Sequence, residues 1–242
     1  MNDLNLILAA FFTSCLAGAM GMGGGVLLIA LMPGLVPVAA IIPLHAATQL
    51  ASNASRAYFG RSSIAWHMLP ALMLGAALGA WAGAEVYSSL NLRWLPAIIG
   101  CIILLLTWLP GSKMRGGGQL GLVALGFYQT GLGMIAGATG PLGAAVLMRT
   151  NSEKNWLVVN TAVYMTINHI LRVLAFVLLG FSFSDWWELL AGMIMASIAG
   201  SWAGTWLRQY MPQVNFSKWF KLLVTLLALR MILLDLMGGN LL

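Results

Sequence analysis

Two ladders of polar side chains run through segments that are otherwise apolar. In the first ladder, hydrogen-bonding side chains recur at i, i+3, i+4, i+7, i+8 and i+11, namely His45, Thr48, Gln49, Ser52, Asn53 and Arg56. This spacing places all six on one face of a helix. Because polar groups are expensive to bury in hydrocarbon, we expect this face to line a cavity or to contact a partner helix. Imidazole, hydroxyl, amide and guanidinium groups, with no carboxylate among them, can hold an anion by donating hydrogen bonds.

A glycine-rich break precedes the first ladder. An uninterrupted membrane helix would not carry the run Gly21-Met22-Gly23-Gly24-Gly25, because each interior glycine costs roughly 1 kcal/mol of helix stability relative to alanine. A helix that begins after such a break presents unpaired N–H groups and the positive end of its dipole, which an anion can use. We expect the N–H groups of Gly23, Gly24 and Gly25 to act in this way. The alternative is that the glycines only allow close helix packing.

The break and the ladder occur again 116 residues later without a gap. Gly21 corresponds to Gly137, and Arg56 corresponds to Arg172. The second ladder consists of Thr161, Tyr164, Met165, Asn168, His169 and Arg172, and the second break offers the N–H groups of Ala138, Thr139 and Gly140. This coincidence indicates an internal duplication. It predicts an N-terminal repeat over 1–110 and a C-terminal repeat over 119–242, joined by a basic, glycine-rich linker at 111–118 that is typical of a cytoplasmic loop.

Composition identifies the class of protein. The chain is 60% hydrophobic and 7% charged, whereas soluble domains average about 25% charged residues. Its apolar runs are long and do not alternate, so helices rather than barrel strands must span the bilayer. We therefore expect an all-α polytopic membrane protein with a lipid bilayer around it. The apolar segments lie at about 4–20, 25–33, 38–59, 66–84, 92–110, 119–136, 141–148, 155–180, 186–207 and 217–237.

The basic residues distinguish two topologies. If every segment crosses the membrane, with each glycine break inside a single span, the loop Lys and Arg divide six against four. If each break is instead the tip of a re-entrant hairpin, each half crosses three times, and nine basic residues gather on one side with only Arg93 opposite. The positive-inside rule favours the second topology. It predicts an inverted repeat in the inner (plasma) membrane, with the basic side cytoplasmic and both termini outside. A single long broken helix is the alternative, because the arm from Leu4 to Met20 is long enough to cross roughly 25 Å by itself.

Several kinds of chemistry lack the residues to carry them. No acidic residue lies centrally in any apolar segment, so only His45 and His169 could titrate there. The break has no following Lys-Ser/Thr, and HExxH, paired aspartates and a recognisable Ser/His couple are absent. We expect no catalytic residues, no metal and no cofactor. The basic residues lie in short loops rather than in one patch, so nucleic-acid binding is not expected either.

The two arginines have two interpretations. Arg56 and Arg172 lie late in their helices. Each could attract an anion to one entrance of a transport path, or each could be an anchor whose long side chain reaches the membrane interface. For the two histidines, a structural hydrogen bond and contact with a substrate are both open.

Three stretches carry a family signature. They are Gly18-Ala19-Met20-Gly21-Met22-Gly23-Gly24-Gly25 followed by Pro33, Ala47-Thr48-Gln49-Leu50, and Gly75-Ala76-Ala77-Leu78-Gly79-Ala80-Trp81-Ala82-Gly83. In these stretches the chain resembles the TauE/SafE sulfite-exporter family, and the resemblance covers both halves. It implies export of sulfite or a small organosulfur anion. The second half departs from the pattern, because Gly137-Ala138-Thr139-Gly140-Pro141 stands where such proteins often repeat a glycine triplet.

The residues and the resemblance together predict a secondary transporter that exports a small anion by alternating access between two inverted repeats. An anion channel and an intramembrane enzyme are the alternative functions. A homodimer is an alternative to a monomer.

The topology is testable by labelling single cysteines in a cysteine-free background. Positions 35, 89 and 183 should react from the outside, and positions 63, 114, 152 and 212 from the cytoplasm, because nine basic residues gather on the cytoplasmic side. Labelling of positions 35 and 63 from the same side would exclude the inverted, re-entrant topology.

Overall fold

The computed structural model describes residues 2–21, 23–108, 118–148, 150–151, 153–210 and 217–237. This part of the chain is helical and contains no strand. The α-helices are α1 (Asn2–Met20), α2 (Gly24–Leu31), α3 (Val38–Phe59), α4 (Leu69–Ser89), α5 (Leu95–Trp108), α6 (Gln119–Ala136), α7 (Gly140–Leu147), α8 (Lys154–Leu178), α9 (Trp187–Leu207) and α10 (Ser217–Leu236). Most of the predicted linker, 111–117, and positions 114, 152 and 212 lie outside the described residues.

The predicted apolar segments are confirmed as helices to within a few residues. The clearest difference is α4, which continues to Ser89 because Glu85 lies on its exposed side and does not interrupt it. In the described part, five helices are long and apolar enough to cross a membrane, at 3–20, 66–89, 119–136, 154–178 and 183–207. The α3 helix is not among them, because the first polar ladder lowers its hydropathy.

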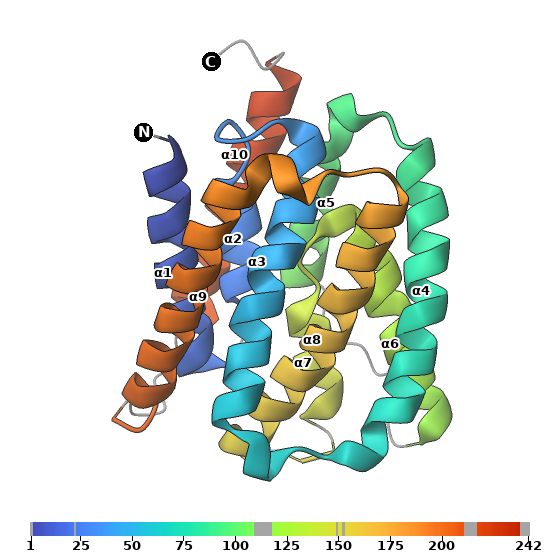
Figure 1. Cartoon of the computed structure of the whole chain (residues 1–242), viewed down its shortest axis with the longest axis vertical. Coiled ribbons are helices and arrows are strands. Elements are labelled where there is room, and N and C mark those ends of the chain that lie inside the picture. Colours follow the sequence, from blue (N-terminus) through green and yellow to red (C-terminus); the bar gives the residue numbers. More distant parts are fainter. Residues whose placement is uncertain are drawn as a thin grey trace.

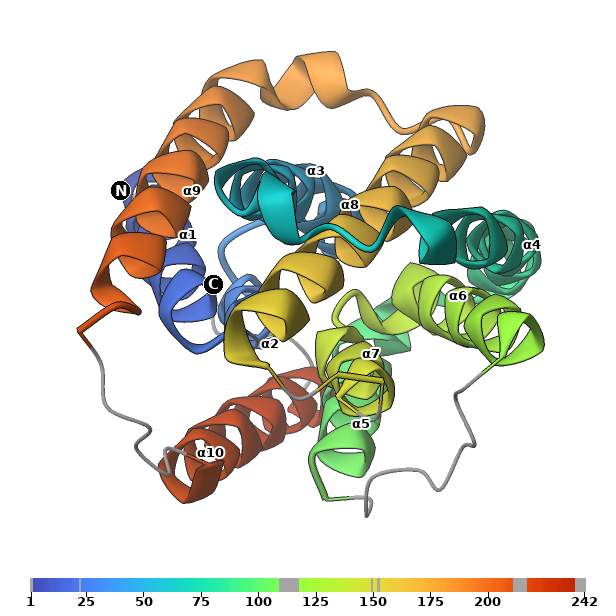
Figure 2. The same ribbon diagram turned by 90° about the horizontal axis from the view of Figure 1, so that it is seen from below.

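Two ladder-bearing helices form the centre of the bundle (Figures 1 and 2). The α3 and α8 helices pack on each other, and in Figure 1 α3 runs downward while α8 runs upward. Each flanking pair takes one helix from each half, because α9 packs on α1 and α4 packs on α6. The α5 and α10 helices form a further pair. The start of α1 and the end of α10 lie at the same end of the molecule.

Small residues bring the flanking helices into backbone contact. A Cβ atom added at Gly79 of α4 would overlap the carbonyl oxygen of Phe127 on α6. One added at Gly204 of α9 would overlap the carbonyl oxygen of Cys15 on α1. The glycine ridges of α4 and α9 therefore pack helices tightly, as small residues spaced by four do in membranes.

Both glycine breaks reverse the chain. Gly21 and Gly23 have φ of 88° and 96°, and Gly137 has φ of 72°, which glycine adopts readily and other residues rarely do. After the first break α2 returns beside α1, so that a Cβ atom at Gly24 would overlap the Thr13 carbonyl oxygen. After the second break α7 returns beside α6, and the Thr139 hydroxyl donates to the Gln129 carbonyl oxygen at 3.1 Å. Each break thus forms a helical hairpin whose tip lies inside the bundle.

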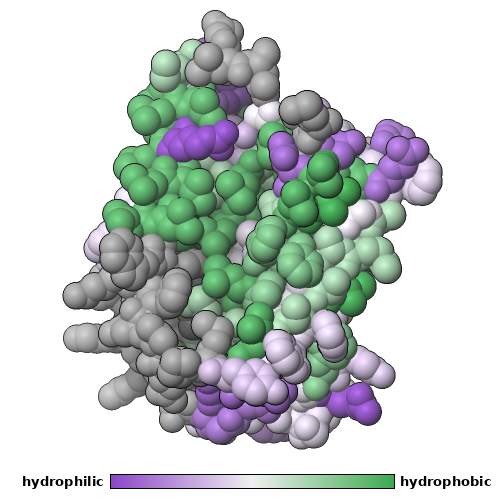
Figure 3. All heavy atoms as spheres, turned by 90° about the vertical axis from the view of Figure 1, so that its left-hand side faces the viewer, coloured by the Kyte–Doolittle hydropathy of each residue, from purple (hydrophilic) through white to green (hydrophobic). Residues whose placement is uncertain are grey.

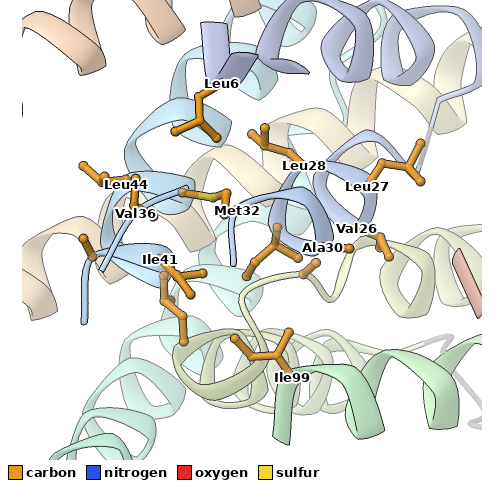
Figure 4. Close-up of a cluster of buried hydrophobic side chains, with 14 of the residues drawn as sticks. Leu6, Val26, Leu27, Leu28, Ala30, Met32, Val36, Ile41, Leu44 and Ile99 are labelled. Atoms are coloured by element: carbon orange, nitrogen blue, oxygen red, sulfur yellow. The ribbon is translucent and has the colours of Figure 1, made fainter. Parts of the chain in front are cut away.

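The first hairpin is held by a large apolar core. Leu28, Ile29 and Met32 of the returning segment are fully buried, and they pack with Leu6, Ile41, Leu44 and Ile99 from other helices (Figure 4). On the face shown in Figure 3, hydrophilic residues gather toward the two ends and hydrophobic residues lie between them. Large apolar side chains such as Trp81 of α4 and Trp202 of α9 are exposed on the protein, as expected of a surface that lipid covers.

The close packing of α4 on α6 makes a stability prediction. Gly79→Ala should lower the unfolding temperature of the purified protein, because the added methyl group pushes against backbone at a typical cost of about 1–3 kcal/mol. Gly118→Ala is the matched control, since a Cβ atom there meets nothing within 4 Å. Equal unfolding temperatures for the two variants would contradict this account of the ridge.

Candidate functional site

The two hairpin tips meet α3 and α8 at a cavity of about 30 Å³. Of the predicted site residues, its lining contains Gly23, Gly24, Gly25, His45, Gln49, Asn53, Arg56, Gly140, Thr161 and His169. It also contains Ala17, Gly21, Val26, Gly137, Ala138 and Met165. A cavity needs roughly 10–15 Å³ to hold one water, so this one can hold only an ion of a few heavy atoms.

Each ladder divides into two rows. Residues at i, i+4 and i+8 face the cavity in both helices, whereas those at i+3 and i+7 face a neighbouring helix. In the first half Thr48 donates to the Leu44 carbonyl oxygen at 2.9 Å, and the Ser52 hydroxyl lies 3.1 Å from that of Ser201 on α9. The division follows from helix geometry. Seen down the helix axis, the residue at i+3 lies to one side of residue i and the residue at i+4 lies to the other side.

The second ladder divides in the same way. Tyr164 and Asn168 are buried toward α6 and α7 rather than toward the cavity, and the Asn168 amide donates to the Thr130 hydroxyl at 3.1 Å. Gln129 of α6, which the sequence analysis did not single out, is 1% exposed, and both atoms of its amide lack a partner among the described residues. The sequence signal for Gln129 is a polar residue within an apolar segment, but Gln129 does not continue the spacing of either ladder.

Both arginines bind the helix end that precedes a break. Arg172 donates through Nη1 to the Gly137 carbonyl oxygen at 2.7 Å, at the end of α6. Arg56 donates through Nη1 to the Ala17 carbonyl oxygen at 2.9 Å, in the last turn of α1, and through Nη2 to Asn53 Oδ1. A cation at a helix C-terminus offsets the negative end of the dipole. Arg56 is 6% exposed and Arg172 is 0% exposed, so neither reaches the protein surface as an interfacial anchor would.

The two histidines come from opposite halves and meet at the cavity. Their ring centroids are 6.0 Å apart. His45 Nε2 lies 2.9 Å from the Gly25 carbonyl oxygen, an acceptor, which assigns the proton to Nε2. His169 Nδ1 lies 3.2 Å from Arg172 Nη1, a donor, which makes Nδ1 the acceptor and leaves the proton on Nε2. His169 Nε2 therefore carries an N–H that has no partner among the described residues.

Unpartnered donors converge on this part of the bundle. His169 Nε2, Gln49 Nε2 and Arg56 Nε are buried without a hydrogen-bond partner in the described chain, as are Arg172 Nε and Nη2 and Thr161 Oγ1. Each unsatisfied buried group costs about 1–3 kcal/mol. The first N–H groups of α2 and the Gly140 N–H of α7 add to this set, because the first turn of a helix has no internal acceptors. The predicted Ala138 N–H does not, since it donates to the Ala136 carbonyl oxygen at 2.8 Å. None of the described residues that line the cavity is a carboxylate. The arrangement is complementary to a small, acceptor-rich anion.

Comparison with known proteins identifies the family. A family model described as sulfite exporter TauE/SafE matches residues 6–231. The chain belongs to the TauE/SafE sulfite-exporter family. Comparison with the curated proteins and with the solved structures finds no significant match. The resemblance seen in the sequence is thereby confirmed, and with its apolar helices this TauE/SafE protein is a multi-pass membrane transport protein.

Six predicted residues of this TauE/SafE protein do not line the cavity, namely Thr48, Ser52, Thr139, Tyr164, Asn168 and Arg172. Five of them, all except Arg172, lie behind the lining residues and contact α6, α7 or α9. Arg172 is nearer, because its guanidinium contacts the cavity-lining His169. Groups of three or more His, Cys, Asp or Glu that could hold a metal do not occur among the described residues.

The cavity makes a binding prediction. Small inorganic oxyanions such as sulfate, sulfite or phosphate should raise the unfolding temperature of the detergent-solubilised protein, since a ligand of the folded state stabilises it by mass action. Gly140→Leu should abolish this shift, because the nearest side-chain atom to a Cβ atom at Gly140 is Met165 Cε at 4.0 Å and the larger side chain would enter the cavity. Gly118→Leu, away from the cavity, should keep the shift. An undiminished shift in Gly140→Leu would exclude this binding site.

Proposed function

We propose that the protein exports sulfite or a small organosulfur anion across the inner (plasma) membrane by alternating access. The observation that carries the proposal is the cavity between the hairpin tips, which collects unpartnered donors and two helix N-termini and has no carboxylate in its lining. Preorganised donors of this kind bind negative charge strongly where water is scarce. Family membership supports the same substrate class, because the family is described as sulfite exporters.

Size and charge favour a compact oxyanion. A cavity of about 30 Å³ excludes nucleotides and sugars in this conformation. A trigonal or tetrahedral oxyanion offers acceptors in several directions, which suits donors that approach from both hairpins and from both ladder helices. We assign substrate contact to the cavity-lining residues of the predicted set, and a supporting role to Thr48, Ser52, Thr139, Tyr164 and Asn168.

Alternating access would come from two homologous, inverted halves, residues 1–110 and 119–242. The opposite directions of α3 and α8 and the exchange of flanking helices between halves support this proposal. Two such halves can rock about a site at their interface, as inverted-repeat carriers do. The basic residues at the end of the molecule where α3 finishes support placing that end in the cytoplasm, with both termini outside.

The arginines would act at the two ends of the path. Arg56 lies near the C-terminal end of α3, toward the proposed cytoplasmic side. Arg172 lies near the C-terminal end of α8, which faces the opposite side because α8 runs antiparallel to α3. Because each guanidinium also holds the end of a hairpin helix, movement of a hairpin would move the charge that attracts the anion. We therefore propose that Arg56 and Arg172 couple anion attraction to opening at their respective entrances.

Flux measurements test this proposal. In proteoliposomes loaded with sulfite, efflux should be saturable, should show counterflow and should accelerate when the interior is made negative, because the potential acts on an anion with roughly 2.3 kcal/mol per charge per 100 mV. No pH gradient should be required, since no carboxylate relay lines the path. Flux without saturation or counterflow would indicate a channel. Flux that does not depend on voltage but follows the pH gradient would exclude anion uniport. It would indicate that His45 and His169 couple transport to protons.

A further inference from the structure

A second cavity, of about 430 Å³, opens at the end of the molecule where α3 and α9 finish and α8 begins. This end lies at the bottom of Figure 1. We call this cavity the vestibule. It is lined by Phe59, Gly60, Ser62, Glu153, Lys154, Asn155, Thr205, Arg208 and Gln209. It is much larger than the central cavity and most of the residues that line it are polar, so a solvated ion fits within it.

Arg208 is held in the vestibule by a chain of hydrogen bonds. Its Nη2 donates to Asn155 Oδ1 at 3.0 Å, and the Asn155 amide donates to the Ser63 hydroxyl at 3.0 Å. Partial burial lowers the pKa of the guanidinium, while the Glu153 carboxylate acts in the opposite sense. The Thr205 hydroxyl, one turn earlier, is buried without a partner in the described chain. Arg208 is therefore a positioned, partly desolvated cation rather than a freely solvated one.

The vestibule retains a positive balance although Glu153 lines it. The Glu153 carboxylate accepts the backbone N–H groups of Asn155 at 2.7 Å and Trp156 at 2.6 Å, so it is engaged as the cap of α8. Lys154 and Arg208 supply two cations against this one carboxylate. The net field attracts an anion.

The vestibule leads toward the central cavity. Helix α9 packs on α3, the helix that carries the cavity-lining Arg56, and Arg208 follows directly after the last residue of α9. Adjacent valines of α8 contact both linings, with Val158 Cγ2 against Gly21 of the central cavity and Val159 Cγ2 against Gly60 of the vestibule. The two cavities therefore border neighbouring residues of one helix.

The equivalent place at the opposite end is filled. The register of the ladders pairs Gly60 with Phe176, and the register of the glycine ridges, which pairs Gly83 with Gly204, pairs Arg208 with Tyr87. The rings of Tyr87 and Phe176 pack edge to face with centroids 5.0 Å apart, and Phe176 is 1% exposed. An aromatic pair therefore occupies the space that a glycine and an arginine leave open at the vestibule.

We propose that the vestibule is an anion-capture site, in which Arg208 binds the small oxyanion before it passes Arg56 to the central cavity. This inference rests on the proposed function and adds a residue and a site to it. A positive charge in the vestibule raises the local concentration of the anion. Removing the charge of Arg208 should therefore weaken the apparent affinity for the anion more than it lowers the maximal rate.

The test compares three variants in proteoliposomes that hold the protein with its vestibule facing the sulfite-loaded interior. Arg208→Gln should raise the half-saturating sulfite concentration roughly three- to tenfold with little change in maximal rate, and the difference from wild type should shrink at high ionic strength. Arg208→Lys should restore most of the affinity, because it keeps the charge. Arg61→Gln is the matched control, since Arg61 lies at the same end, stacks on Tyr58 and does not line the vestibule.

The outcomes separate the two proposals. Absence of sulfite efflux in the wild-type protein would overturn the proposed function and the capture site with it. Wild-type efflux with unchanged half-saturation in Arg208→Gln would overturn the capture site alone, as would an equal change in Arg61→Gln. Equal losses in Arg208→Gln and Arg208→Lys would also overturn it, because they would show that the hydrogen bond to Asn155, rather than the charge, is what matters.

Discussion

The rest of this structure depends on two helices that end inside an apolar bundle. A helix end leaves backbone carbonyl or N–H groups without internal partners, and lipid offers none. Here carbonyl groups at the two C-terminal ends accept hydrogen bonds from side chains of the protein, because Arg56 donates to the Ala17 carbonyl oxygen and Arg172 to that of Gly137. The two N-terminal ends, at Gly24 and Gly140, instead border the cavity. Several unmet donors of the described residues thus lie at a cavity where an anion can accept their hydrogen bonds.

This constraint explains why so much of the chain is glycine or another small residue. The hairpins can return only if α2 packs directly on α1, which requires no side chain at Gly24. The ladder helices can stay central only if α1 and α9, and α4 and α6, approach to backbone contact through glycines such as Gly79 and Gly204. Tight packing of the outer helix pairs therefore keeps the two ladder helices, with their polar groups, at the centre of the bundle.

The two glycine breaks and their ladder helices share this arrangement, but the two ends of the molecule differ. At one end Gly60 and Arg208 line an open, polar vestibule, while at the other Tyr87 and Phe176 fill the equivalent space. Under the proposed duplication the two ends start as equivalent, so such substitutions are a simple means by which the two sides of a membrane come to be treated differently. The second half also carries Gln129 and Tyr164 with unpartnered buried atoms, whereas the corresponding first-half ladder residue Thr48 is satisfied within its own helix.

The sequence by itself determined the membrane class, the helix positions and the family, because hydropathy, glycine spacing and polar periodicity are local properties of the chain. It also identified most of the cavity lining, since a polar face in an apolar helix has few other places to go. It did not separate Gln49 from Thr48 or His169 from Asn168, because residues one apart share the predicted face and only the neighbouring helix decides which one reaches the cavity. Nor did it find Arg208, which looked like any loop arginine. Its position in the vestibule arises from the packing of α9 against α3, a contact between residues about 150 apart that no local pattern encodes.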